Sequence, residues 1–385
     1  MTSRQIKHEP PGFFVKEELD ARGWTQADLA FVLEMPPQQL NPILSGKHAI
    51  TAQMAVALED ALGMPAEFFS NLQKQYDLAN VGPGSLAIQK RSMWQGTYPL
   101  REMIARGWVE DTDAELLDAQ MMRFLEVKRL ADVPHLGEHA RATAHAAKKS
   151  SDERATPEQL AWLHRVRQMA RYVKVAPYSA DRLLAATHRM AALRTSPEDA
   201  IAACDMLSDA GVRFVVVETL PRAKIDGVCT WLSDDEPVVA ISNRFDGLDN
   251  FWFVLRHEIE HVLRGHGRDA VVFDDETTLA PDAVEIEERQ ANEAASDFCV
   301  PRSEMASFIA RKGNFVSEQD VIGFSKRLAV HPAIIVGQYQ FATKKWSFLR
   351  KYLSSSVCGV RKCLAAALAE RNMIDGWGTV AAVSL

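Results

Sequence analysis

The chain has 385 residues, a formal net charge of −7 at pH 7 and 47% hydrophobic residues. This length suffices for two or three domains with cores of their own, and the composition excludes a fibre or a largely disordered protein. Charged residues interrupt the first thirty positions, and no stretch approaches the roughly 20 apolar residues that cross a bilayer, so we expect a cytoplasmic protein without a membrane partner.

Residues 1–80 are predicted to form a compact helical domain, because apolar residues recur there at helical spacing between glycines. Thr25 can cap a helix that begins in "TQADLA", and a tight turn near Met35 precedes "PPQQLNPILSGK". Over roughly residues 8–78 these segments resemble a helix-turn-helix domain of the Xre/Cro type, and more closely the HigA-like antitoxins.

This resemblance implies a set of DNA contacts. Gln26, Gln38 and Gln39 would face base edges, where an amide side chain binds adenine through two hydrogen bonds. Asn41 and Lys47 would face phosphates. A domain of this kind would serve transcription regulation.

Two features favour an alternative role for this domain. Pro42 lies inside the predicted recognition helix, where it removes one backbone hydrogen bond. Residues 1–77 carry six Lys and Arg against ten Asp and Glu, although phosphate contacts supply much of DNA affinity. The alternative is a helix-turn-helix used only for protein contacts or for a homodimer.

The segment "NVGPGS" reads as a linker after the first domain. Residues 86–195 have a helical pattern without recognisable chemistry, and we expect them to form a helical scaffold region. Residues 346–385 are expected to form a helical tail whose basic residues lie on a solvated face.

The pattern changes after Gly211, where three short β-rich runs follow one another, at residues 212–217, 228–232 and 238–242. They predict a small antiparallel sheet that leads into a long helix beginning near Asp249 or Asn250. The fold class is therefore α+β and mostly helical, with a helix-turn-helix bundle at the amino terminus.

That long helix contains the sequence HExxH, as His257-Glu258-Ile-Glu-His261. Two histidines four residues apart project from one face of a helix, so both imidazoles can reach a single ion. Zinc suits them because it accepts nitrogen and carboxylate ligands and keeps one position for water. Glu258 can take a proton from that water. The alternative is a surface helix with solvated acids and histidines that have ordinary partners.

The segment "EERQANEAAS" offers a third ligand on a second helix, 27 residues after His261. Glu288 and Asn292 share a face there, and the alanines between them permit close helix packing. Glu288 would bind the metal, and Asn292 would hydrogen-bond a ligand histidine. Glu287 and Glu293 are the competing acids, and neither has such a polar partner four residues on.

Residues 212–301, with "NFWFVLRHEIEHVLRGH" and "EERQANEAASDFCVP", resemble the ImmA/IrrE family of metallopeptidases. The resemblance implies a gluzincin-like domain over residues 196–345, with Zn²⁺ held by His257, His261 and Glu288, and Glu258 as the catalytic base. It also implies a helix-turn-helix repressor protein as the substrate, whose cleavage releases stress, mobile-element or defence genes. Ala294 departs from the aromatic residue that is frequent in this family.

Three other residues are weaker candidates. His331 and Tyr339 could stabilise the oxyanion, although a packing role is the ordinary explanation for each. Cys229, 28 residues before His257, could bind zinc and keep the enzyme latent, or could be an ordinary strand cysteine.

The leading hypothesis is thus a zinc endopeptidase, a hydrolase of a repressor-type protein, with a helix-turn-helix domain attached. The rival is a HigA-like DNA-binding antitoxin or autorepressor whose peptidase-like domain is not catalytic. A third hypothesis is a metal-bearing sensor that binds a partner without cutting it.

Overall fold

The computed structural model of the protein describes residues 9–82, 84–134, 136, 155–268, 272–273, 282–313 and 315–381. The chain forms two compact units, Met1–Ser85 and Leu86–Leu385, which we call unit 1 and unit 2. The three segments expected after the linker all lie in unit 2. No helix of the described ranges is both long enough and apolar enough to cross a membrane.

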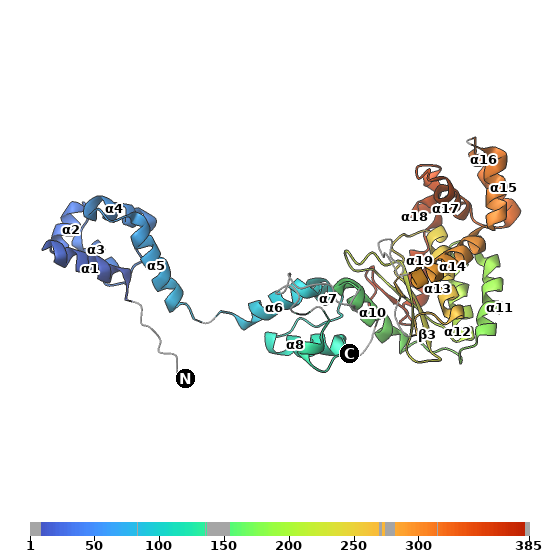
Figure 1. The fold of residues 1–385 in the computed structure, drawn as a ribbon, viewed down its shortest axis with the longest axis horizontal. Coiled ribbons are helices and arrows are strands. Elements are labelled where there is room, and N and C mark those ends of the chain that lie inside the picture. Colours follow the sequence, from blue (N-terminus) through green and yellow to red (C-terminus); the bar gives the residue numbers. More distant parts are fainter. Residues whose placement is uncertain are drawn as a thin grey trace. The chain divides into compact units, whose positions relative to one another are not determined.

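Unit 1 is a bundle of helices around a small apolar core (Figure 1). The helices are α1 (Pro11–Arg22), α2 (Gln26–Val32), α3 (Pro37–Leu44), α4 (Ala52–Leu62) and α5 (Ala66–Asn80). The predicted cap at Thr25 is present, because its hydroxyl accepts the Asp28 N–H while the Asp28 carboxylate accepts the Thr25 N–H. Leu29, Leu40 and Leu44 are buried and hold α2 and α3 against the other helices.

Unit 2 contains the sheet and the remaining described helices. The strands are β1 (Arg213–Val217), β2 (Gly227–Trp231), β3 (Pro237–Ile241), β4 (Val272–Phe273) and β5 (Ile374–Asp375). The helices before the sheet are α6 (Leu86–Thr97), α7 (Leu100–Ala105), α8 (Ala114–Phe124), η1 (Leu130–Asp132), α10 (Pro157–Ala170), α11 (Ala180–Met190), η3 (Ala191–Leu193) and α12 (Ala200–Ala210). Those after β3 are α13 (Leu248–Arg264), α14 (Asp282–Cys299), α15 (Arg302–Lys312), α16 (Glu318–Leu328), α17 (Pro332–Thr343), η4 (Arg350–Leu353), α18 (Ser355–Cys358) and α19 (Arg361–Leu368).

The predicted fold class, α+β and mostly helical, is confirmed, but the sheet is mixed and not purely antiparallel. Its strand order is β4-β2-β3-β1-β5. β2 pairs antiparallel with β3 and β4, whereas β1 pairs parallel with β3 and β5. Only the turn at residues 233–236 is short enough to be a hairpin, and the longer connection after β1 lets β3 enter beside it in the same direction.

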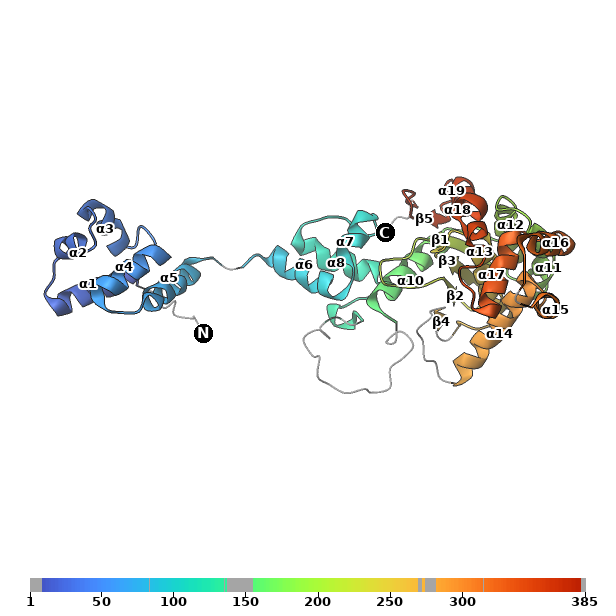
Figure 2. The same cartoon turned by 90° about the horizontal axis from the view of Figure 1, so that it is seen from above.

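Helices cover both faces of this sheet. Both views place α10 on one side of the strands and α13 on the other (Figures 1 and 2). Trp162 of α10 is buried and donates from Nε1 to the Val217 carbonyl, 2.9 Å away. Every residue of β2 and β3 is buried, as expected for strands that are covered twice. The sheet is therefore a rigid support for α13.

The segment predicted as a helical tail, residues 346–385, also supplies a strand. After α19 the chain enters β5, which pairs with β1 at the edge of the sheet. Asp375 of β5 is buried and accepts a hydrogen bond from Arg165 Nε of α10, at 2.6 Å. A strand of two residues is too short for periodicity to reveal, which is why the sequence pattern missed it.

Candidate metal centre

The HExxH segment lies in the second half of α13. This helix begins after Gly247 and ends at Gly265, which adopts a left-handed conformation with φ 73°. Its apolar face packs on β2 and β3 and also carries the site. His257, Glu258 and His261 are only 0%, 1% and 2% exposed, so these polar groups are held in a largely dry environment.

Helix α14 brings an acid to the two histidines. His257 Nε2 and His261 Nε2 lie 3.0 Å apart. Glu288 places Oε2 at 3.2 Å from His257 Nε2 and Oε1 at 3.3 Å from His261 Nε2. Ala291 and Ala295, one and two turns further along α14, are buried and allow the two helices to pack closely. The predicted third ligand therefore faces both imidazoles.

These three groups suit a zinc ion. Ligand atoms about 2.0–2.2 Å from a tetrahedral zinc ion lie about 3.3 Å from one another, close to the separations observed here. Two imidazole nitrogens and a carboxylate are also the donor set that zinc accepts. Among the described residues, His257, His261 and Glu288 form the one cluster of potential ligand atoms with this proximity.

Electrostatics favour a cation at this point. Burial opposes ionisation of Glu288, but its contacts with His257 and His261 outweigh burial and lower its pKa to about 2. The carboxylate is therefore ionised at neutral pH and faces two ring nitrogens.

Glu258 occupies a position beside the strand β2. A Cβ atom added to Gly227 would lie 2.5 Å from Glu258 Oε1 and 2.7 Å from Val254 Cγ1. Only the absence of a side chain at Gly227 allows the Glu258 carboxylate to pack this closely against the strand backbone. Glu258 is thus held between its own helix and the sheet, one residue away from the first histidine of the cluster.

Two other acidic residues of α14, Glu287 and Glu293, have partners outside the candidate ligand cluster. Glu293 forms an ion pair with Arg302 at 3.4 Å, and Glu287 faces His266. Asn292 is exposed on α14, and its hydrogen bond to a ligand histidine stays a prediction.

The predicted DNA-contacting residues lie on the surface of unit 1. Gln38 and Gln39 stand in the first turn of α3, Gln26 is the first residue of α2, and all three are exposed. Asn41 and Lys47 are exposed too. Pro42 does not end α3, which continues to Leu44. The sequence of α3 contains no acidic residue, so the acids of unit 1 lie outside this helix.

Comparison with known proteins matches a part of each unit to a family. A helix-turn-helix family matches residues 15–69, and the peptidase family described as IrrE N-terminal-like domain matches residues 209–332. The chain is a helix-turn-helix protein with an IrrE N-terminal-like domain. The IrrE-like domain contains the whole candidate metal centre and the strands that support it.

Individual relatives cover a smaller part of the chain. Virulence-associated protein A' of Dichelobacter nodosus is 35% identical over 97 residues, which is 25% of this chain and 84% of that protein. The uncharacterized HTH-type transcriptional regulator YddM of Escherichia coli K12 is 30% identical over 76 residues, 20% of this chain and 81% of that protein. A solved HigA-family addiction module antidote protein from Coxiella burnetii is 31% identical, covers 23% of this chain and 89% of its own, and has a TM-score of 0.19.

The IrrE-like domain holds one residue near the candidate ligands that the sequence analysis missed. His266 follows the end of α13, and its Nδ1 lies 3.0 Å from His261 Nδ1. Burial lowers the pKa of His266, which favours the neutral ring. The signal in the sequence was the pair Gly265-His266 directly after the helix, because a glycine there turns the chain back toward the last helical turn.

Cys229 has a partner other than the ligand cluster. Its thiol donates to the His266 carbonyl at a sulfur–oxygen distance of 3.5 Å. Burial, together with the nearby Glu258 carboxylate, raises the pKa of this thiol well above its ordinary value. This hydrogen bond is one that an ordinary strand cysteine can make, and the zinc-binding role of Cys229 stays a hypothesis.

The two oxyanion candidates have structural roles. His331 caps α17, since its Nδ1 accepts the Ala333 N–H at 3.1 Å. Tyr339 is 1% exposed, and its ring packs against Phe348 with centroids 4.6 Å apart. Both contacts agree with the packing role that we named as the ordinary explanation.

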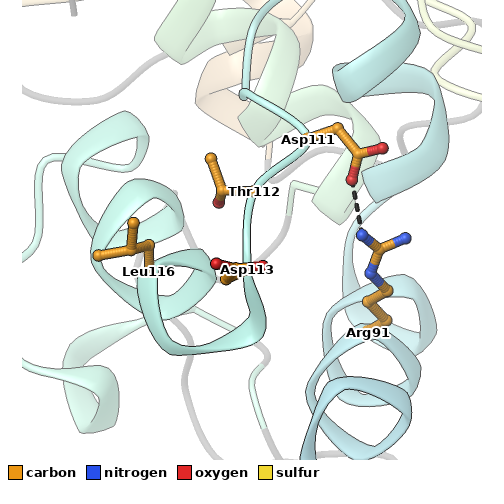
Figure 3. A pocket seen from close by; sticks show the side chains of 5 residues that line it. All are labelled: Arg91, Asp111, Thr112, Asp113 and Leu116. Carbon is orange, nitrogen blue, oxygen red and sulfur yellow. Dashed lines mark hydrogen bonds and ion pairs between the residues drawn. The ribbon is translucent and has the colours of Figure 1, made fainter.

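A polar pocket elsewhere in unit 2 is separate from the metal centre. It is lined by residues of α6, of α8 and of the segment before α8, namely Arg91, Asp111, Thr112, Asp113 and Leu116 (Figure 3). Arg91 and Asp111 face each other across it and form an ion pair at 2.6 Å. Because its basic group already has an acidic partner, the pocket does not point to a particular ligand.

Proposed function

We propose that the protein is a zinc-dependent endopeptidase that cuts a helix-turn-helix repressor-type protein and thereby derepresses stress, mobile-element or defence genes. The observation that carries the proposal is the convergence of His257, His261 and Glu288 within 3.0–3.3 Å, beside a buried Glu258. The match to the IrrE N-terminal-like peptidase family over residues 209–332 supports peptidase chemistry at this point.

Each residue then has a defined task. Zinc, when bound, supplies an acidified water and polarises the scissile carbonyl. His257, His261 and Glu288 would hold the ion. Glu258 would take the proton of the attacking water and later deliver it to the leaving amine. Its burial between α13 and Gly227 limits competing water and fixes the direction of the carboxylate.

The helix-turn-helix domain would act in the cytoplasm, by placing the peptidase near its substrate. A repressor bound at an operator and a peptidase bound at neighbouring DNA share a small volume, so their effective concentration is raised. The exposed face of α3, with Gln38, Gln39 and Asn41 and no acidic residue, supports DNA binding despite the acidic balance of unit 1. A homodimer would place two such faces on successive half-sites.

The test is the variant Glu258→Gln, which keeps the size of the side chain and removes the base. We expect cleavage of a co-expressed helix-turn-helix protein, followed by mass spectrometry of fragments, to fall at least about 100-fold. Zinc content should stay equal to wild type, because Glu258 is not a proposed ligand. The matched control is Glu293→Gln, an exposed acid of α14, which should cleave normally. Undiminished cleavage by Glu258→Gln would reject the proposal.

A second candidate function is a HigA-like antitoxin or autorepressor whose peptidase-like domain is not catalytic. The exposed amides of α3 favour it, because they suit base contacts whatever the second unit does. Full cellular function of Glu258→Gln, with a gel shift of the protein on its own upstream DNA at stated salt, would support this rival. Loss of function in Glu258→Gln, with the gel shift unchanged, would support the peptidase.

A further inference from the structure

His266 is brought to the metal centre by the way α13 ends. The Gly265 N–H donates to the Val262 carbonyl at 3.0 Å, and the His266 N–H donates to the His261 carbonyl at 2.9 Å. This pair of bonds, with a left-handed glycine between the helix and His266, is the Schellman ending. Such an ending places the residue after the glycine against the residue five positions earlier, which here is the ligand candidate His261.

The strand β2 fixes the backbone of this turn. The His266 carbonyl accepts hydrogen bonds from Trp231 Nε1 at 2.7 Å and from Cys229 Sγ at 3.5 Å. Gly267 has φ 78°, and a Cβ atom there would lie 2.7 Å from the Cys229 carbonyl oxygen. His266 is therefore held to the sheet and is not on a free loop.

The ring geometry sets the direction of the hydrogen bond. His261 presents Nε2 to His257 and Glu288, so its proton belongs on Nδ1 when Nε2 binds an ion. That Nδ1–H would then donate to His266 Nδ1, 3.0 Å away. The opposite nitrogen of His266, Nε2, lies 3.7 Å from Glu287 Oε1, an electrostatic contact that favours a proton on this nitrogen. The contacts therefore run from Glu287 to His266, from His266 to His261, and from His261 to the other two candidate ligands.

We propose that His266 is a positioning residue that holds His261 in the tautomer and ring orientation required for metal binding, and that Glu287 orients His266 in turn. This inference rests on the proposed metal site. Outer partners of this kind fix ligand histidines in metal sites and raise their basicity, and their loss costs about 10- to 100-fold in metal affinity. The two neighbouring acids of α14 would then have different roles. Glu288 would bind the ion, and Glu287 would orient His266.

The experiment measures the zinc dissociation constant of the full chain by competition with a chromophoric chelator. His266→Leu removes the acceptor, and we expect the dissociation constant to rise about 10- to 100-fold. His266→Asn keeps an acceptor at the place of Nδ1, and we expect it to recover most of the lost affinity. The control His188→Leu removes an exposed histidine of α11 and should bind zinc as wild type does.

A second readout is the Nδ1–H proton of His261 in the zinc-loaded protein. Long-range ¹⁵N–¹H correlation spectra report this proton and its exchange with water. Wild type and His266→Asn should show a hydrogen-bonded Nδ1–H that exchanges slowly, and His266→Leu an Nδ1–H that exchanges quickly. If His266→Leu does not fold, as judged by circular dichroism, His266→Gln replaces it, because its amide lies beyond the place of Nδ1.

The outcomes separate the two proposals. Failure of the wild-type protein to bind zinc would reject the proposed function. A different result would reject the role of His266 and leave the proposed function standing. In that result the wild type binds zinc normally, and His266→Leu, or His266→Gln if that replaces it, has equal zinc affinity and an equally slow exchange of the His261 Nδ1–H.

Discussion

Glu287 and Glu288 are adjacent acids on α14 that contact different partners. Successive side chains on a helix project about 100° apart, so Glu287 and Glu288 cannot face the same group. Glu288 faces the two imidazoles, and Glu287 faces His266. His266, which follows the end of α13, is thus the contact of Glu287. Moving both acids by one position along α14 would disrupt both contacts together.

Asp249 carries a pH-dependent part of the stability at the other end of α13. It lies in the first helical turn against α17, where a Cβ atom on Gly337 would approach its Oδ2 to 2.7 Å. Burial raises its pKa to about 6, so the folded state binds this proton more tightly than the unfolded state. The resulting stabilisation is complete below about pH 4 and is lost as the pH rises through about 6.

The variant Asp249→Asn should remove this dependence. We expect it to be more stable than wild type at pH 7.5 by up to about 3 kcal/mol, with the advantage shrinking toward pH 4. Urea unfolding midpoints at several pH values measure the difference. The exposed Asp209→Asn serves as the control. A difference between Asp249→Asn and wild type that does not change with pH would contradict the assignment.

At the scale of elements, the sequence pattern predicts what is periodic or local. The apolar period of α13 and the HExxH spacing identify His257, Glu258 and His261, and the helix of Glu288 follows from the same period. The contact of His266 depends on how the chain turns after Gly265, and no periodicity encodes that turn. The parallel pairing of β1 with β3 and with β5 depends on long connections, whose course is a tertiary property.

The strand β2 limits the space available to the Glu258 side chain. A substitution at Gly227 tests this limit. Gly227→Ala places a methyl group within 2.5–2.7 Å of Glu258 Oε1 and Val254 Cγ1. Overpacking of this kind costs about 1–3 kcal/mol. We expect cleavage to fall more than zinc affinity, because the proposed base moves and the proposed ligands stay. Unfolding curves, zinc titration and the fragment assay measure the three effects.

The matched control for this strand variant is Gly323→Ala. Gly323 lies exposed in α16 with no atom near its absent Cβ, so alanine should stabilise that helix by about 0.5–1 kcal/mol. If Gly227→Ala behaves like Gly323→Ala, then β2 does not constrain Glu258.

At the scale of the whole molecule, an ion pair joins the middle of unit 2 to its last strand. Arg165 of α10 and Asp375 of β5 are both nearly fully buried, and Arg165 also donates to the Ala381 carbonyl at 3.0 Å. Breaking a buried pair by removing one partner costs about 3–5 kcal/mol, because the other charge is left without compensation. We therefore expect Arg165→Met to lose that much stability in urea unfolding of the full chain.

A double variant and a control variant test this expectation. Arg165→Met combined with Asp375→Leu should recover much of the loss, because no buried charge remains. Arg91→Ala breaks the exposed pair with Asp111, and should cost about 1 kcal/mol or less. A loss in Arg165→Met no larger than that of Arg91→Ala would show that the buried pair does not hold the sheet edge in place.

The position of β5 at the outer edge of the sheet has a consequence for how the protein is made on the ribosome. The strand β1 and the guanidinium of Arg165 are synthesised long before their partners at Ile374 and Asp375. Until those residues leave the exit tunnel, one sheet edge and one charge of the nascent chain stay unsatisfied. The proposed metal ligands are therefore translated before the fold that supports them is finished, and the emergence of β5 completes the sheet beside β1.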